Sequence, residues 1–328
     1  MPTTLFDSKV IQEAVTAACR APSLHNSQPW QWVYSDGQLR LFLDPSRVMD
    51  TDQSAREALI GCGAALDHFR VAMAAAGWQA HVEYFPHAES PNHLASMTFA
   101  PIDYLTERDQ LRARAISARR TDRLPFSAPT DWKSIASIWV GDVDGKAVRI
   151  DTIPGEVVAE LTEAAQIAES LRLYDGAYHD ELHWWTAPFE KAEGIPHSAL
   201  VSAAESDRVG IERVFPVVHR PERRTEIQED QAMILLLSTD SDCRADVLAS
   251  GQALSAVLLE CTMVGFATCT VTHLTELSET RKIVQSLTRP DATPQVLVRV
   301  GVVPITEKAP PPTPRRPLSE VLRLRAFD

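Results

Sequence analysis

The pattern of apolar and polar positions changes repeatedly along the chain between the spacing of helices and that of strands. Residues 9–20 place their apolar positions on one helical face, whereas residues 81–85 alternate as a strand does. Helices are expected over residues 9–20, 54–76, 105–119, 156–171 and 247–264 and after Ser278. Strands are expected over residues 30–34, 39–43, 81–85, 94–99, 148–153, 233–238, 267–272 and 295–303. The chain is therefore predicted to mix helices and strands from end to end.

Two segments lack a regular pattern. Residues 172–230 show no sustained helical or strand period, although their aromatic residues include Tyr174, Tyr178, Trp184, Trp185 and Phe189. Residues 309–317 are too rich in proline for helix or sheet, because proline fixes its own backbone angle and lacks an N–H donor. We expect this second segment to run as an extended arm.

A faint internal repeat links two of the predicted helices. The segment from Gly63 to Gly77 aligns without gaps with the segment from Gly251 to Gly265, and each is followed by an aromatic residue and a predicted strand. Two buried, alanine-rich helices could share these identities by coincidence. This window alone therefore leaves both a repeat and a chance match open.

Composition narrows the classes of partner. The chain has 328 residues and a net charge of −12, which argues against nucleic acid or an anionic membrane as the partner of its whole surface. The N-terminus lacks the basic and apolar regions of a signal peptide. The five cysteines are scattered without a Cys-x-x-Cys pair, as is typical of free thiols in a reducing compartment. A cytoplasmic protein is expected.

One group of polar residues lies in the loop from Arg20 to Trp30. Its serines, histidine, asparagine and glutamine stand between Pro22 and Pro29, so the loop can present a fixed row of donors and acceptors to a planar heterocycle. The alternative is an ordinary connection between a helix and a strand, with local capping and turn hydrogen bonds.

Arginines form two further groups. Arg119, Arg120 and Arg123 stand close to Thr121, a combination that suits a phosphate because guanidinium groups bind its oxygens bidentately and the hydroxyl adds a donor. The alternative is a solvated basic end of the preceding helix. In the proline-rich arm, Arg315 and Arg316 require either an anion or a carboxylate partner, or else they belong to a solvated tail.

No metal site is expected. His179 and His183 have the spacing of two zinc ligands on one helical face, but no third ligand is apparent and the glutamate is not placed as in a zinc protease. The segment beginning Gly61-Cys62-Gly63 lacks the third glycine of a dinucleotide-binding fingerprint.

Taken together, these motifs resemble the nitroreductase superfamily of FMN flavoproteins. The loop from Pro22 to Trp30 matches that family's Pro-Ser-x-x-Asn-x-Gln-Pro-Trp pattern at every fixed position, and Arg119 to Phe126 resembles its arginine motif. The apolar helix that ends at Gly265 and the terminal Arg315-Arg316 are also similar to family features. Across nearly the whole chain the closer similarity is to the Acg subfamily of mycobacterial and actinobacterial proteins, which are associated with dormancy.

The order of the motifs departs from that of the family. In family members the arginine motif comes first, and each flavin of a homodimer takes its phosphate ligands from one chain and its Pro-Ser-Asn contacts from the other. Here the loop comes first and the arginine motif lies near residue 120. The resemblance therefore implies an α+β fold of two fused nitroreductase-like halves, residues 1–118 and 119–328, around an internal pseudo-two-fold axis. The same resemblance implies that the chain has one composite FMN site and is monomeric.

The resemblance also assigns roles. Arg119, Thr121, Arg123 and Arg315 or Arg316 would hold the phosphate and ribityl chain, and Thr272 with His273 would place a backbone donor near flavin N5. The first half would line the flavin with Pro22, Ser23, Leu24 and Asn26. No catalytic acid or base is assigned.

Two functions remain open at this point. The first is hydride transfer from NAD(P)H through the flavin to a nitroaromatic, quinone or similar small acceptor. The second is storage of FMN with little turnover, if the insertion at residues 172–230 forms a lid over the site.

Overall fold

The structure is a computed structural model that describes residues 8–130, 147–187, 192–304, 307 and 310–324. Its helices are α1 Ser8–Ala18, α2 Arg56–Ala75, α3 Glu107–Ala118, α5 Val158–Arg172, α6 Gly176–Trp185, α7 Ala203–Ser206, α8 Arg244–Met263, α9 His273–Glu276, α10 Ser278–Thr288 and α11 Leu318–Val321. Its strands are β1 Trp30–Ser35, β2 Gln38–Leu43, β3 Trp78–Tyr84, β4 His93–Pro101, β5 Val148–Thr152, β6 Met233–Thr239, β7 Ala267–Val271, β8 Thr293–Gly301 and β9 Leu322–Leu324. The fold is α+β, as expected.

The strands form two sheets with the same internal order. One sheet has the order β3-β4-β2-β1-β9 and the other has the order β5-β6-β8-β7. Read from β3 and from β7, both sheets follow the chain in one pattern, and every neighbouring pair in this shared part is antiparallel. The tight hairpin between β1 and β2 corresponds to the long connection between β5 and β6, which contains α5, α6 and α7.

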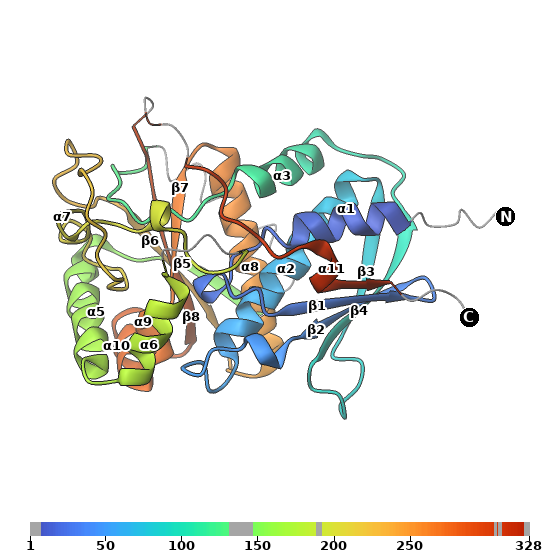
Figure 1. Ribbon diagram of the computed structural model, residues 1–328, viewed down its shortest axis with the longest axis horizontal. Coiled ribbons are helices and arrows are strands. Elements are labelled where there is room, and N and C mark those ends of the chain that lie inside the picture. The colour runs from blue at the N-terminus through green and yellow to red at the C-terminus, as the bar shows by residue number, and fades with distance from the viewer. Residues whose placement is uncertain (1–7, 131–146, 188–191, 305–306, 308–309, 325–328) are drawn as a thin grey trace.

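Helices α2 and α8 pack against each other between the two sheets (Figure 1). The close approach depends on two glycines that face each other. A Cβ atom on Gly63 would lie 2.1 Å from the Leu248 carbonyl oxygen, and one on Gly251 would lie 2.1 Å from that of Ile60. These are the first glycines of the two aligned sequence windows. The second glycines, Gly77 and Gly265, both adopt a φ of +85°, which glycine tolerates and which ends each helix before a strand.

The proline-rich arm crosses from the second half of the chain to the first sheet. Residues 310–317 have no regular secondary structure, and the short helix α11 then leads into β9, which pairs in parallel with β1 (Figure 1). The arm thus brings Arg315 and Arg316 next to residues near the N-terminus.

Most predicted elements are confirmed to within a few residues, and the differences are local. Residues 172–230 are largely irregular, but the expectation is wrong for residues 176–185, which form α6. The structure also contains α11 and β9, which the pattern did not predict because both are too short to show a period. By length and composition alone, α2 could cross a membrane, but 78% of its apolar window is buried within the protein.

Candidate functional site

Two adjoining cavities bring together the polar segments identified in the sequence. The first, which we call the main cavity, has a volume of about 760 Å³ including its mouth, and the second, the arginine cavity, about 530 Å³. Both are lined by Pro22, Ser23, His25, Thr121 and Arg123. Residues separated by about a hundred positions therefore form one continuous site.

Almost all of the site residues predicted from the sequence line one of these cavities. The main cavity includes Leu24, Thr272 and His273 besides the shared residues. The arginine cavity includes Asn26, Arg119 and Arg315. Arg316 lines neither, because its guanidinium lies 3.2 Å from Glu320 and 4.0 Å from Asp44. The arm thus directs its two neighbouring arginines to different surroundings.

The loop before β1 is held in an unusual backbone conformation. His25, Asn26 and Gln28 all have φ values near +50° to +60°, which non-glycine residues rarely adopt. Local hydrogen bonds stabilise the loop, since the Gln28 N–H donates to the Ser23 hydroxyl at 3.0 Å. The Asn26 amide donates to the carbonyl oxygens of Gly194 and Pro314, both at 3.1 Å. Asn26 therefore joins three distant segments, while its Oδ1 atom stays buried without a partner among the described residues.

The arginine cavity contains five arginines: Arg20, Arg119, Arg120, Arg123 and Arg315. Their guanidinium groups donate only to backbone carbonyl oxygens, for example Arg315 to Cys19 at 2.7 Å and Arg119 to Arg20 at 3.1 Å. Within the described part of the chain, none of the five has a carboxylate at ion-pair distance. Five cations thus converge without a counter-charge from these residues.

Burial and mutual repulsion make this cluster electrostatically unfavourable in the absence of an anion. Burial, with Arg20 and Arg120 nearby, lowers the pKa of Arg119 to about 10, and burial beside Arg20 and Arg119 lowers the pKa of Arg315 well below its usual value. Arg119 therefore remains protonated at neutral pH. Buried charges require compensation, and a phosphate group offers about two negative charges and several acceptor oxygens. The donor set therefore fits a phosphate.

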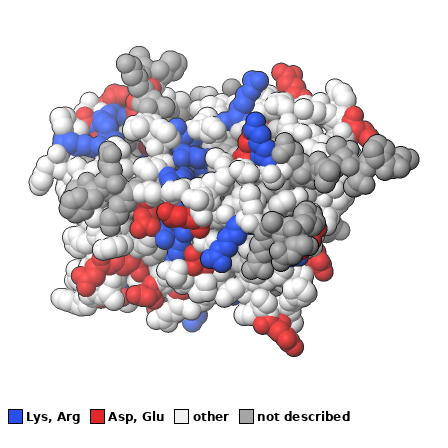
Figure 2. Space-filling view, turned by 45° about the vertical axis from the view of Figure 1, so that its right-hand side comes forward, with Lys and Arg blue, Asp and Glu red and all other residues white. Residues whose placement is uncertain are grey.

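The charges on the molecular surface are distributed unevenly. On the face shown in Figure 2, basic side chains gather mainly toward the middle, with acidic side chains mostly around them. The chain as a whole carries a charge of −12. The basic cluster is therefore a local feature of a protein whose overall charge is negative.

The main cavity has an apolar wall and a polar end. Ile60, Gly61 and Leu254 line it from the central helix pair, and a Cβ atom on Gly61 would lie 3.2 Å from the Ser23 Cβ. Glycine thus keeps the space between α2 and the loop open. Phe215 completes the wall, with the Arg123 guanidinium 4.9 Å from its ring centre. Such an arrangement suits a flat aromatic ring.

At the polar end, two buried histidines have Nε2 atoms without hydrogen-bond partners among the described residues, although the Glu181 carboxylate lies 3.9 Å from one of them, that of His25. These are His25 and His273, and burial, with Arg213 nearby, lowers the pKa of each to about 3. Both are therefore neutral at physiological pH. Arg213 itself pairs with Glu276, which also accepts a hydrogen bond from Thr272 at 2.6 Å.

Several of these residues were missed by the sequence analysis. Glu212, Arg213 and Phe215 belong to the irregular stretch of residues 172–230, which also contributes Gly194, Ile195 and Ala199 to the arginine cavity. The aromatic residues singled out in that stretch do not provide the wall: Tyr174 and Trp184 are 94% and 59% exposed. Phe189 lies outside the described residues. No sequence signal distinguished Phe215, because its position depends on contacts between distant segments.

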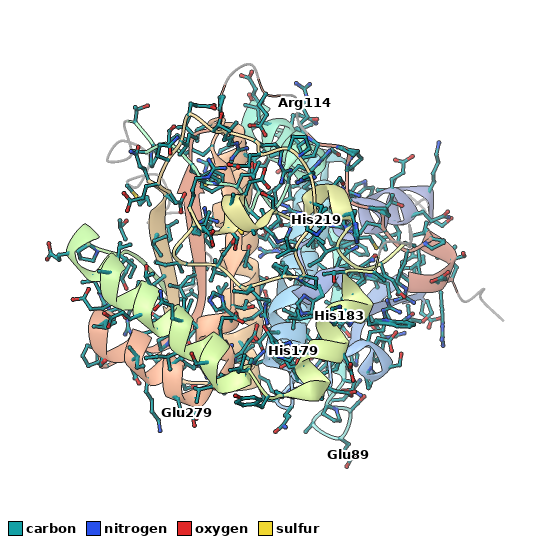
Figure 3. The ribbon with its side chains drawn as sticks, turned by 60° about the vertical axis from the view of Figure 1, so that its left-hand side comes forward. Glu89, Arg114, His179, His183, His219 and Glu279 are labelled. Atoms are coloured by element: carbon teal, nitrogen blue, oxygen red, sulfur yellow. The ribbon has the colours of Figure 1, made fainter. Side chains whose placement is uncertain are left out.

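The histidine pair on α6 stands apart from this site. His179 and His183 project from one helix, as Figure 3 shows. Among the described residues, no group of three or more histidine, cysteine, aspartate and glutamate side chains could hold a metal ion.

The fold and site define an α+β protein with a composite cavity suited to a ligand that carries both an anionic group and a flat ring. No family model matches the chain. It is 56% identical over 329 residues to a Mycobacterium tuberculosis protein named "Putative NAD(P)H nitroreductase acg", covering 100% of this chain and 99% of that protein. It is 48% identical over 321 residues to an uncharacterised protein of the same organism, covering 96% and 93%. The chain belongs to the Acg subfamily of the nitroreductase superfamily.

Solved structures give a weaker similarity. An FMN-dependent nitroreductase of Mycobacterium smegmatis, NfnB, whose structure contains NADPH, is 16% identical, with a TM-score of 0.40. The match covers 67% of this chain and 100% of that one. At this level the similarity carries no argument about the ligand of the present chain.

Proposed function

We propose that the chain binds one FMN, with the phosphate in the arginine cavity and the isoalloxazine ring in the main cavity. The observation that carries this proposal is the convergence of five buried or half-buried arginines, without carboxylate partners in the described residues, next to the main cavity with its apolar wall. FMN supplies both parts that such a site requires. When bound, it would accept and donate electron pairs at its ring.

The proposal gives each segment a task. Arg119 and Arg315 would hold the phosphate, together with Arg120, which belongs to the arginine group identified in the sequence, and Arg20, to which the sequence analysis gave no phosphate role. Arg123 and Thr121 lie where the two cavities join and would bind the ribityl chain. Pro22, Ser23 and Leu24 would contact the ring, with backbone groups at Thr272 and His273 facing its other edge. Arg316 would anchor the arm through Glu320.

We further propose that the molecule consists of two fused nitroreductase-like halves, residues 1–118 and 119–328. The shared strand order of the two sheets supports a duplication, as does the packing of Gly63 against Gly251. Strand β9 comes from the second half and joins the sheet of the first, so the halves interlock. The interface that would build a dimer lies within one chain, and light scattering should give the mass of a monomer.

As an enzyme, the protein would transfer a hydride equivalent from NAD(P)H to a small aromatic acceptor. Anaerobic mixing of the FMN-loaded protein with NADH or NADPH provides the test. Bleaching of the flavin absorbance, followed by its recovery on addition of a quinone or nitroaromatic compound, is the expected result. Flavin that stays oxidised with both nucleotides would contradict the reductase function.

One observation favours a second candidate function, the retention of FMN with little turnover. Glu212, Arg213 and Phe215 form one side of the main cavity and would lie against the ring face that a nicotinamide needs. Replacing Phe215 by alanine should then accelerate bleaching by NAD(P)H. Val217→Ala, at a position that is 54% exposed on the same segment, is the matched control. Equal rates in the two variants would remove the covering role of Phe215.

A further inference from the structure

Glu212 is a buried carboxyl group in the wall of the main cavity. It is 7% exposed and lies between α7 and the cavity residues Arg213 and Phe215. The Ser206 hydroxyl donates to its Oε1 atom at 2.7 Å. Its Oε2 atom is buried and has no hydrogen-bond partner among the described residues. One oxygen is therefore fixed while the other remains available to a ligand.

The charged groups around Glu212 come from several segments. Arg123 follows α3, Arg299 comes from β8, Asp230 precedes β6 and Cys269 comes from β7. Burial raises the pKa of Glu212 to about 7, against the opposing effects of Arg299, the Ser206 hydrogen bond and Arg123. The carboxyl group can therefore change its protonation state near neutral pH.

Other polar groups in the described cavity wall are already engaged or do not titrate in this range. Burial raises the pKa of Glu57 well above its ordinary value, but this carboxyl group is engaged by Arg56 and interacts with Asp52. The Thr272 hydroxyl is bonded to Glu276. His25 and His273 are neutral bases with a pKa of about 3. Burial also raises the pKa of the Cys269 thiol, which would keep it protonated.

We propose that Glu212 is the general acid that protonates an acceptor of the quinone class in the main cavity. This inference rests on the proposed reductase function. Reduction of a quinone to a hydroquinone takes two electrons and two protons. A bound reduced flavin would account for both electrons and one proton through its hydride chemistry, and Glu212 delivers the second proton to the quinone oxygen and becomes a carboxylate. Solvent protons then restore the acid.

The first test observes the carboxyl group itself. Infrared difference spectra of the FMN-loaded protein, recorded between pH 5 and 9, should contain a protonated-carboxyl band that disappears with a midpoint near pH 7. The band should be absent in Glu212→Gln, which can still accept the Ser206 hydrogen bond. A band with the same midpoint in this variant would overturn the inference.

The second test measures the reaction. Photoreduced protein is mixed anaerobically with 1,4-benzoquinone, and flavin reoxidation is followed as a function of pH. In the intact protein the rate should fall about tenfold per pH unit above pH 7, and Glu212→Gln should be slower by about a hundredfold at pH 6, with no such fall. Glu212→Asp should keep a titrating limb. An unchanged pH profile in Glu212→Gln would overturn the inference.

A neighbouring carboxyl provides the control. Glu169 accepts a hydrogen bond from the Val214 N–H at 3.3 Å but does not line the main cavity. Glu169→Gln should retain both the infrared band of Glu212 and the pH profile, and loss of either would contradict the assignment. If the intact protein is not reoxidised by the quinone at any pH, the reductase function fails and the inference fails with it. If the quinone reoxidises the flavin at the same rate with and without Glu212, the inference about Glu212 fails but the reductase function stands.

Discussion

Two cavities contain clustered arginines, but they differ in the acidic groups that accompany them. The arginine cavity combines Arg20, Arg119, Arg120, Arg123 and Arg315. A far cavity of about 1280 Å³, including its mouth, lies between α2, α8, α3 and β3. Its charged lining residues are Asp67, Arg70, Asp109 and Arg112.

The difference lies in how the charges are compensated. In the far cavity, the Arg112 guanidinium lies 3.4 Å from Glu260, Asp67 accepts a hydrogen bond from Ser255 at 2.5 Å, and Asp109 caps α3. In the arginine cavity, the guanidinium groups have only carbonyl partners among the described residues. An anion site is thus identified by the absence of internal counter-charges and not by the number of arginines.

The largest effect is expected at the contact between helices α2 and α8, which line the main cavity and the far cavity. Gly63→Ala would place a methyl group 2.1 Å from the Leu248 carbonyl oxygen and 3.0 Å from Gly251 Cα, so the helices must move apart. We expect the free energy of unfolding to fall by about 3 kcal/mol or more. Denaturant unfolding measures the loss. Gly176→Ala, where a Cβ atom has no neighbour within 4 Å, should change stability by less than about 1 kcal/mol.

The next effect separates the two arginine-containing regions directly. Arg123→Ala should weaken FMN binding by about 1.5–3 kcal/mol, or roughly tenfold to a hundredfold, because a charge-assisted contact is lost. Arg112→Ala, in the far cavity, should leave FMN affinity unchanged although it loses the Glu260 ion pair. Titration of the apoprotein with FMN gives both constants. Equal affinities in the two variants would remove Arg123 from the site.

Lowering the pH should destabilise the protein through His25 and His273 in the main cavity, rather than through groups in the far cavity. Burial holds the pKa of His25 and His273 near 3, below the ordinary value of 6.5, so the unfolded chain binds more protons between these pH values. Stability is then complete above pH 6.5 and falls by about 1.4 kcal/mol per pH unit and per histidine as the pH drops toward 3.

Substitution can verify this pH dependence. His273→Gln should reduce the slope of unfolding free energy against pH, because one buried titrating base is removed. The exposed His81, on β3 beside the far cavity, provides the control, and His81→Gln should leave the slope unchanged. If both variants keep the slope of the intact protein, His273 does not contribute to the pH dependence of stability.

The sequence predicted the long helices α2 and α8 better than the contact between them or the short strand β9. Long periodic segments such as residues 54–76 and 247–264 gave α2 and α8, since their apolar faces are buried in any arrangement of the core. The repeat between Gly63 and Gly251 was faint in sequence, and it became interpretable only when both glycines were found at one helix contact. Strand β9 was missed because its three residues are ordered by pairing with a distant strand.

The site was predictable where chemistry is concentrated in one short segment. The loop at residues 22–29 and the arginines at residues 119–123 contain several donors close together, so their types alone indicated a ligand. Phe215 and Glu212 are single residues in an irregular stretch, and only folding places them beside Arg123. Arg20 was adjacent to the predicted loop but gained its significance from Arg119 and Arg315, which are distant in sequence.

The smallest expected difference is a factor of two in the number of FMN molecules bound per chain, and it tests whether the far cavity also binds flavin. If the two halves had kept equivalent sites, a chain would release two FMN molecules on heating, whereas we expect about one. The reason is electrostatic: a phosphate in the far cavity would meet Asp67 and Asp109 as well as Arg70 and Arg112, so its charge would gain little there. Flavin released from protein of known concentration, quantified by absorbance, measures the ratio. Arg123→Ala sharpens the result, since it should bring the ratio toward zero at low FMN concentration if the arginine site is the one occupied. A ratio near two in the intact protein, with one equivalent surviving in Arg123→Ala, would mean that the far cavity also holds flavin despite its internal counter-charges.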